Sequence, residues 1–165
     1  MDNITLIGMP GSGKSTVGVV LAKMLGYRFL DADLLIQERQ GALLQELLDA
    51  HGVDAFLDME KEAICSIDCR RTVIAPGGSC VLRDASMAHL KDLGRVLYLR
   101  LSFGELEHRI TNLASRGIAF GPGQDLKSVY HQRAPLYERW ADLTLDVDGQ
   151  SLRETLDSVI HAIQS

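Results

Sequence analysis

The residues with the most specific chemistry stand near the start of the chain. Gly8, Gly13, Lys14 and Ser15 fit the pattern G-x-x-x-x-G-K-[ST], the signature of a P-loop. Its glycines let backbone N–H groups surround phosphate oxygens, while the lysine meets the terminal phosphates and the serine hydroxyl is a ligand for Mg²⁺. We therefore predict nucleotide binding, with ATP and Mg²⁺ as cofactors. The predicted nucleotide-binding residues of the loop are Gly11, Ser12, Gly13, Lys14, Ser15 and Thr16.

A pair of carboxylates follows the second predicted strand. Asp31 and Asp33 are two residues apart, so on a strand they would face the same crevice at the carboxyl end of the sheet. One carboxylate can hold Mg²⁺ and the other can accept a hydrogen bond from an attacking hydroxyl, the two acidic roles of phosphoryl transfer. The alternative for Asp33 is a structural one, the N-cap of the next helix.

Several other classes of P-loop protein fit the chain less well. A GTPase would carry an N-K-x-D run, which the sequence lacks, and a motor or transport ATPase would be longer than 165 residues. The P-loop, the pair of aspartates and the short chain together favour a small kinase.

Short apolar segments alternate along the chain with segments of helical periodicity, and these elements must position the residues named above. This alternation is typical of an α/β fold, a parallel sheet with crossover helices. Strands are predicted at residues 4–8, 27–31, 72–75, 95–101 and 143–147. Helix starts are predicted at Ser102 and Ser151, each followed by a glutamate three residues later. The stretch 115–125 contains several glycines and is predicted to be a mobile loop.

Composition limits the other possibilities. A chain of 165 residues with 46% hydrophobic residues fits one domain, spanning 1–165, and its net charge of −5 argues against nucleic-acid binding. No signal peptide or membrane span is evident, so we expect a cytoplasmic protein, and we expect a monomer. Cys65 and Cys69 could share a helix face, but a zinc site would need two further ligands.

Together these motifs resemble the shikimate kinase family over nearly the whole chain. The matching pieces are residues 8–16, the D-x-D of Asp31 and Asp33, the Gly77-Gly78 pair, and Arg133-Ala134-Pro135-Leu136-Tyr137, which is similar to the family's R-x-P-x-Y signature. The resemblance implies a three-layer P-loop kinase fold with a five-stranded parallel sheet, a lid at about 115–125 and an acceptor-binding helical region at about 33–62.

The resemblance also implies roles for single residues. Asp33 would bind the acceptor hydroxyl and Asp31 would support Mg²⁺ with Ser15. Arg109 would stack on adenine, and Arg116 would enter the site with the lid. The implied catalytic residues are Lys14, Asp33 and Arg116, and the implied substrate-binding residues are Asp33, Phe56, Gly77, Gly78 and Arg133. From the residues alone, Arg116 could equally be a surface arginine, and Arg133 could pair with Glu138 or Asp142 on a helix.

The chain departs from the family pattern at its acceptor site. The family usually reads G-E-x-x-F-R-x-x-E, whereas this chain has Leu57 in place of the arginine that pairs with the carboxylate of shikimate, and Glu60 is retained. Ser79 replaces a third glycine. The expected function is ATP-dependent phosphorylation of shikimate to shikimate 3-phosphate. The alternatives are a related kinase for another small alcohol and a non-catalytic ATP-binding module.

Overall fold

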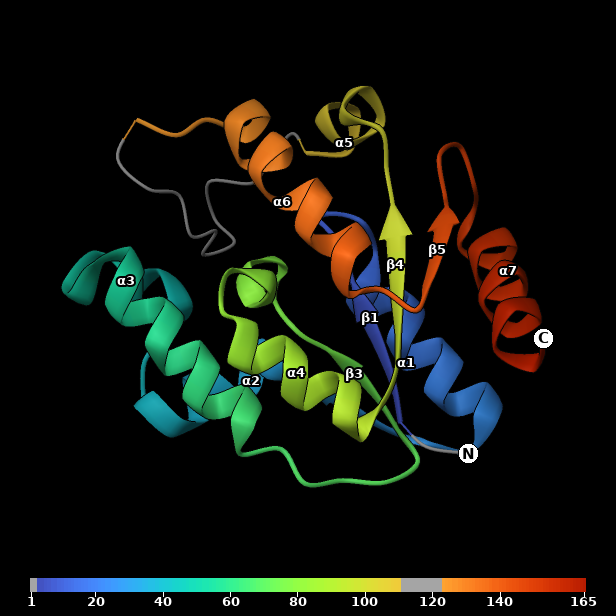
Figure 1. Cartoon of the computed structure of the whole chain (residues 1–165), viewed down its shortest axis with the longest axis horizontal. Coiled ribbons are helices and arrows are strands. Elements are labelled where there is room, and N and C mark those ends of the chain that lie inside the picture. The colour runs from blue at the N-terminus through green and yellow to red at the C-terminus, as the bar shows by residue number, and fades with distance from the viewer. Residues whose placement is uncertain (1–2, 111–122) are drawn as a thin grey trace.

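The computed structural model describes residues 3–110 and 123–165. In chain order the elements are β1 (Asn3–Ile7), α1 (Lys14–Leu25), β2 (Arg28–Asp31), α2 (Ala32–Gln40), α3 (Leu44–Cys65), β3 (Thr72–Ala75), the 3₁₀ helix η1 (Gly78–Leu82), α4 (Asp84–Leu93), β4 (Gly94–Arg100), α5 (Phe103–Arg109), α6 (Leu126–Trp140), β5 (Leu143–Asp146) and α7 (Leu152–Gln164). Figure 1 shows their arrangement.

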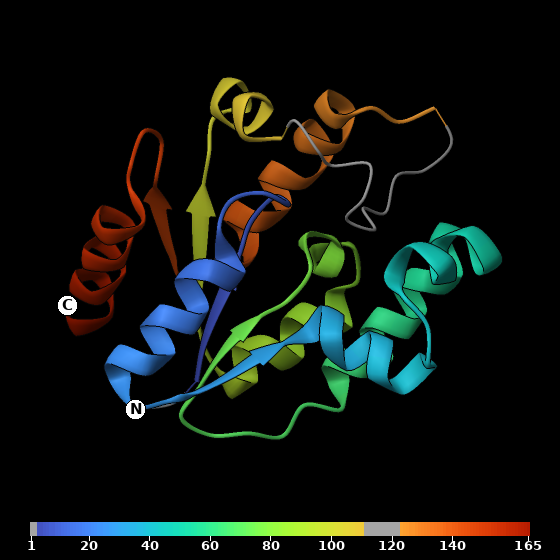
Figure 2. The same cartoon turned by 180° about the vertical axis from the view of Figure 1, so that it is seen from behind.

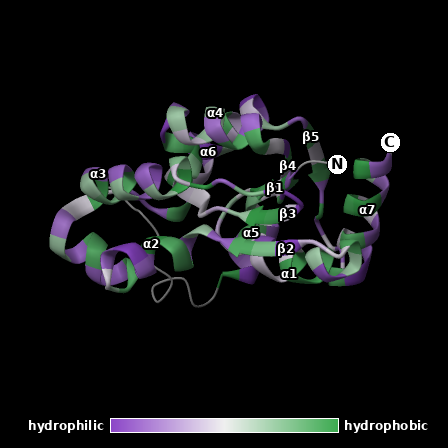
Figure 3. Ribbon diagram, turned by 90° about the horizontal axis from the view of Figure 1, so that it is seen from below, coloured by the Kyte–Doolittle hydropathy of each residue, from purple (hydrophilic) through white to green (hydrophobic). Residues whose placement is uncertain are grey.

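The described strands form one parallel sheet in the order β2-β3-β1-β4-β5. β1, at its centre, is buried along its whole length, as expected of a strand covered on both faces. Helices α1 and α7 lie against one face, and α4 and α6 lie against the other (Figure 3). The prediction of a three-layer α/β fold with a five-stranded parallel sheet is confirmed.

The order of the strands decides where a ligand can bind. The chain leaves β1 toward one edge of the sheet and returns to build the other, so the loops after β1 and β3 diverge at the carboxyl ends of the strands. Open α/β sheets bind ligands in the crevice at such a point. The P-loop and the Gly77-Gly78 turn are those two loops.

Helices α2 and α3 project from the β2 edge of the sheet (Figures 1 and 2). They enclose a hydrophobic cluster of their own, separate from the main core, which contains Ile36, Leu44, Leu47, Phe56, Leu57 and Ala63. Gly52 interrupts α3 with φ 80° and ψ 173°, a conformation that favours glycine. This part of the fold coincides with the predicted acceptor-binding region.

Helix starts predicted from sequence are present. The hydroxyls of Ser102 and Ser151 accept hydrogen bonds from the backbone N–H groups of Glu105 and Glu154. The predicted lid lies outside the described residues except for 123–125, and α6 begins directly after them. None of the helices in the described part has both the length and the apolar character that crossing a membrane requires.

Candidate active site

The P-loop connects β1 to α1 and is shaped by its glycines. Gly11 and Gly13 have φ values of 82° and 90°, in the left-handed region that favours glycine. A Cβ on Gly11 would also lie 2.9 Å from Cγ1 of Ile110. Gly13 is the N-cap of α1, so the positive end of that helix and its first N–H groups point into the loop. The local structure is therefore suited to binding phosphate groups.

Lys14 lies inside this loop. Its Nζ donates hydrogen bonds of 2.8 Å to the carbonyl oxygens of both Gly8 and Met9 and lies 3.4 Å from Oγ of Ser12. The side chain is buried, and burial lowers the pKa of the Lys14 ammonium to about 8, although the charge of Asp33 opposes this shift. The lysine thus supports the loop from inside, through the carbonyl groups of Gly8 and Met9. Ser12, also buried, contributes its hydroxyl to this cluster.

Ser15 and Asp31 place two oxygen atoms that could hold a metal ion close together. The Ser15 hydroxyl donates a hydrogen bond of 3.3 Å to Oδ2 of Asp31, so two oxygen ligands meet at the mouth of the P-loop. Such a pair suits Mg²⁺, which keeps most of its waters and uses few protein oxygens. Among the described residues no cluster of three or more His, Cys, Asp or Glu side chains could hold a metal. Cys65 and Cys69 are free thiols.

The structure corrects one expectation about the two aspartates. Asp31 is the last residue of β2, but Asp33 lies in the first turn of α2 and not on a strand. The N-cap of α2 is Asp31, whose Oδ1 accepts a hydrogen bond of 2.9 Å from the backbone N–H of Asp33. The helix begins earlier than expected because the Asp31 side chain satisfies one of its first N–H groups. Asp33 is not the cap, and its own carboxylate is available to the site.

A cavity of about 650 Å³ joins the P-loop to the projecting helices. Its lining includes most of the predicted site residues: Gly11, Gly13, Lys14, Ser15, Thr16, Asp33, Phe56, Gly77, Gly78, Arg109 and Arg133. Burial and the charge of Asp31 raise the pKa of Asp33 to about 6, with Lys14 opposing both effects. Arg116 lies outside the described residues. One cavity thus brings together P-loop residues, the Asp33 carboxylate and two arginines.

Two arginines enter this cavity from different helices. Arg109, at the end of α5, forms an ion pair of 2.9 Å with Glu105 and borders the P-loop side. Arg133, on α6, is only 1% exposed. The alternative partners predicted for Arg133 bind elsewhere, since Glu138 pairs with Arg100 and Asp142 pairs with Lys91.

The turn after β3 is tightly held. A Cβ on Gly77 would lie 2.8 Å from Oδ1 of Asp33 and 3.0 Å from Oε2 of Glu60, and one on Gly78 would lie 2.7 Å from Cδ of Pro10. A side chain at either position would therefore force its neighbours to move. The Tyr137 hydroxyl donates a hydrogen bond to the Gly78 carbonyl oxygen, a role that was not predicted from the sequence.

Comparisons with known proteins agree with this geometry. Residues 10–164 match the family model "Shikimate kinase". The chain belongs to the shikimate kinase family. It is 37% identical to a shikimate kinase of Thermodesulfovibrio yellowstonii, with 97% of this chain and 94% of the relative aligned, and 34% identical to one of Pseudomonas entomophila, with 99% and 97% aligned. It is therefore an ATP-dependent kinase that phosphorylates a hydroxyl group.

A solved structure extends the likeness to three dimensions. The shikimate kinase of Acinetobacter baumannii, solved in complex with shikimate, superposes with a TM-score of 0.89 at 28% identity and covers 99% of this chain and 93% of its own. Membership of the shikimate kinase family disfavours the alternative of a non-catalytic module. The residues also argue against that alternative, because Lys14, Ser15 and Asp33 line one cavity and Asp31 contacts Ser15.

The two departures from the family pattern, Leu57 and Ser79, lie in different surroundings, because Ser79 lines the cavity and Leu57 does not. Leu57 is buried in the cluster between α2 and α3, and it is absent from the cavity lining. Glu60, one turn further along α3, lines the cavity and is 1% exposed. The Ser79 hydroxyl lies 2.9 Å from both carboxylate oxygens of Glu60. Burial raises the pKa of Glu60 to about 7, although the hydrogen bond from Ser79 opposes this shift.

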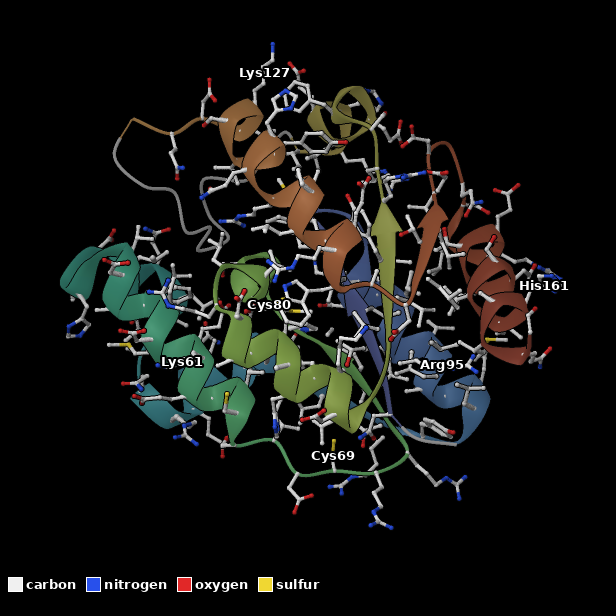
Figure 4. The ribbon with its side chains drawn as sticks, viewed as in Figure 1. Lys61, Cys69, Cys80, Arg95, Lys127 and His161 are labelled. Atoms are coloured by element: carbon white, nitrogen blue, oxygen red, sulfur yellow. The ribbon has the colours of Figure 1, made fainter. Side chains whose placement is uncertain are left out.

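Charged groups on other elements also act on Glu60, namely Asp33, Arg133 and Arg83. Arg83, immediately before α4, forms ion pairs of 3.3 Å with Asp54 and Asp58 on α3. Cys80 follows Ser79 on η1 and lies in the middle of the molecule (Figure 4). Burial raises the pKa of the Cys80 thiol, so it remains neutral. The pairing of Ser79 with Glu60 could not be read from the sequence, because the two residues are 19 positions apart.

Proposed function

We propose that this kinase transfers the γ-phosphoryl group of ATP to the 3-hydroxyl of shikimate, with Mg²⁺ as cofactor. The observation that carries the proposal is the meeting of Lys14, Asp33 and Arg133 in one cavity. The names of the relatives and the shikimate complex of the Acinetobacter enzyme support the choice of acceptor.

The proposed roles follow from the chemistry of each group. Lys14 and the N–H groups at the start of α1 bind the phosphates and stabilise the charge on the transferring group. Asp33 accepts the proton of the acceptor hydroxyl as it attacks, and its pKa of about 6 leaves it mostly ionised at neutral pH. Mg²⁺ on Ser15 and Asp31 would neutralise charge on the phosphate oxygens. Arg133 binds the acceptor carboxylate.

Two further roles rest on the family resemblance. Arg109 would stack on the adenine ring, which its position in the cavity lining and its ion pair with Glu105 support. Arg116 would supply a second positive charge to the transferring phosphoryl group. We also propose that the protein acts as a monomer in the cytoplasm, which light scattering of the purified chain and fractionation of its source cells would check.

A coupled assay tests the acceptor directly. Purified protein with ATP, Mg²⁺ and shikimate should release ADP in proportion to the shikimate consumed, and mass spectrometry should detect a product heavier by one phosphoryl group. Phosphorus NMR would place the group at the 3-hydroxyl. Shikimate-independent ADP release alone, with no phosphorylated product, would reject this function.

A different small alcohol is a second candidate, and Leu57 favours it. This side chain is part of the hydrophobic cluster, so no cation reaches the cavity from the position where the family has its carboxylate-binding arginine. Loss of such a bidentate pair removes roughly 2 to 5 kcal/mol of binding. A panel of sugar acids, polyols and hydroxy amino acids in the same assay separates the candidates, because the true acceptor should show the highest kcat/KM.

A further inference from the structure

Glu60 is a buried acid at the acceptor end of the cavity, and the proposed reaction gives it no role. Its carboxylate approaches the same point as that of Asp33, since both would contact a Cβ on Gly77. No lysine, arginine or histidine lies within ion-pair distance of Glu60 in the described ranges 3–110 and 123–165. A carboxylate in such a place normally has a charged partner or a ligand.

Ser79 satisfies only part of the hydrogen-bonding capacity of Glu60. A serine hydroxyl has one hydrogen, whereas an ionised carboxylate accepts about four hydrogen bonds. The Ser79 hydroxyl is within 2.9 Å of both oxygens, so it shares that hydrogen between them. Glu60 lines the cavity, and its Oε2 would lie 3.0 Å from a Cβ on Gly77, so a donor bound there could use the remaining acceptor capacity.

We propose that Glu60 is a specificity-determining residue that accepts hydrogen bonds from hydroxyl or ammonium groups of the acceptor and disfavours a carboxylate beside it. This inference rests on the proposed function, because it assumes that a small hydroxylated acceptor occupies this cavity. The proposal gives Arg133 and Glu60 opposite preferences for groups of the acceptor. An anionic group of the acceptor goes to Arg133, and its donor groups go to Glu60.

The charge of Glu60 depends on its surroundings as well as on pH. The charged groups that act on it are Asp33 on α2, Arg133 on α6 and Arg83 before α4. The thiol of Cys80 on η1 is neutral. Since the pKa of Glu60 is about 7, the side chain is mostly ionised at about pH 8 and mostly neutral at about pH 5.5. The preference against a carboxylate is therefore strongest at the higher pH.

The test compares two ligands that differ in one charge, shikimate and its neutral methyl ester. Calorimetry measures the Kd of each in the presence of Mg²⁺ and a non-hydrolysable ATP analogue, for the wild type and for Glu60→Gln. At about pH 8 the glutamine variant should shift the ratio of the two Kd values toward shikimate by about tenfold, the effect of removing one negative charge several ångströms away. At about pH 5.5 the two ratios should agree.

Two further variants make the test specific. Glu62→Gln removes an exposed charge from the same helix and should leave the ratio unchanged. Ser79→Ala removes the donor to Glu60 and raises its pKa, so at about pH 8 its ratio should lie between those of the wild type and Glu60→Gln. Thermal melts confirm that each variant folds.

The outcomes also separate this inference from the proposed function. A Kd ratio that is the same in wild type, Glu60→Gln and Glu62→Gln would overturn the inference even if shikimate is phosphorylated. If neither shikimate nor its methyl ester bound to any of the proteins, the inference would be overturned as well. A shift of the ratio without turnover of shikimate would retain Glu60 as a selector and reject shikimate as the substrate.

Discussion

The Tyr137 hydroxyl donates a hydrogen bond to the carbonyl oxygen of Gly78, a residue 59 positions earlier in the chain. Tyr137 is fully buried, and its ring packs on Tyr98 with 5.1 Å between centroids. Helix α6 thus brings Arg133 to the cavity and, one turn later, holds the Gly77-Gly78 turn, which lines the same cavity.

Replacing Tyr137 with Phe should weaken acceptor binding more than nucleotide binding. The ring would still fill its site, but the Gly78 carbonyl would lose its donor at a cost of about 1 to 3 kcal/mol, which corresponds to a fall in Tm of several degrees. Because the turn lines the acceptor side, we expect KM for the acceptor to rise several-fold while the Kd of ATP stays within about twofold.

Tyr130→Phe is the matched control for this change. Tyr130 lies on the same helix and donates a hydrogen bond of 2.8 Å to the carbonyl oxygen of Leu101, away from the turn. It should lower Tm without raising KM for the acceptor. Equal effects of the two variants on KM would show that Tyr137 acts only through general stability.

Lys14→Met should abolish most activity with little loss of stability. The lysine supports the P-loop through Gly8 and Met9, but burial of its charge is itself unfavourable, so the free energy of unfolding should change by no more than about 1 kcal/mol. Removing a donor aimed at developing charge costs roughly 10²- to 10³-fold in kcat. Lys23→Met, an exposed change near the end of α1, should leave kcat unaltered. Parallel losses of Tm and activity in Lys14→Met would contradict this role.

Asp33 should set the acid limb of the pH profile. Only its ionised form accepts a proton, and its pKa is raised to about 6 by burial and by Asp31, so kcat/KM should rise with pH and level off above about 7. Asp33→Asn should lower acceptor-dependent ADP release by orders of magnitude and retain ATP binding. Asp49→Asn, at an exposed position of α3, should keep the wild-type profile. A profile in wild type that is flat from about pH 5 to 8 would exclude Asp33 as the base.

Gly77→Ala should damage catalysis and spare the fold. The φ of Gly77 is −61°, which alanine adopts freely, but the added methyl group would lie 2.8 Å from Oδ1 of Asp33. The carboxylate at the end of that side chain would have to move, and a displacement of about 1 Å can cost 10²-fold in rate. Gly104→Ala, where a Cβ would meet nothing within 4 Å, is the control for kcat/KM. Full activity in Gly77→Ala would show that a methyl group at this turn does not displace the Asp33 carboxylate.

Glu60 should make the stability of the protein depend on pH. Its pKa is raised from 4.5 to about 7 on folding, so the folded state binds more protons between these values. The contribution of neutral Glu60 to the free energy of unfolding is complete below about pH 4.5 and is lost as the pH rises through about 7. The free energy of unfolding should therefore fall by roughly 3 kcal/mol over this range. Urea unfolding of wild type and Glu60→Gln at about pH 5 and pH 8 measures it. The two proteins should differ in this pH dependence, and Glu62→Gln should behave as wild type.

The sheet could be predicted closely from the sequence. All five predicted strands lie within one residue of those observed at each end. Buried parallel strands appear as short apolar runs, and a glycine follows several of them, so both the runs and their ends are local signals. The P-loop was equally predictable, because its spacing, its strand and its helix are all contiguous.

The acceptor site was less predictable because its contacts are not local. Asp33 was expected on a strand, and only the side chain of Asp31 shows that the helix starts first. The bonds from Tyr137 to Gly78 and from Ser79 to Glu60 join distant segments. No periodicity or spacing indicates such pairs, and they become visible only when η1, α3 and α6 are packed together.

Asp31 joins two tasks in a single side chain, since one oxygen starts α2 and the other meets Ser15. Asparagine could still serve as the helix cap, but it would replace the anionic oxygen at the proposed metal site with a neutral group. Alanine would remove both functions at once. A substitution that removes the side-chain acceptor at this position would therefore disturb the start of α2 together with the oxygen that Ser15 contacts, whereas asparagine would change only the second of these.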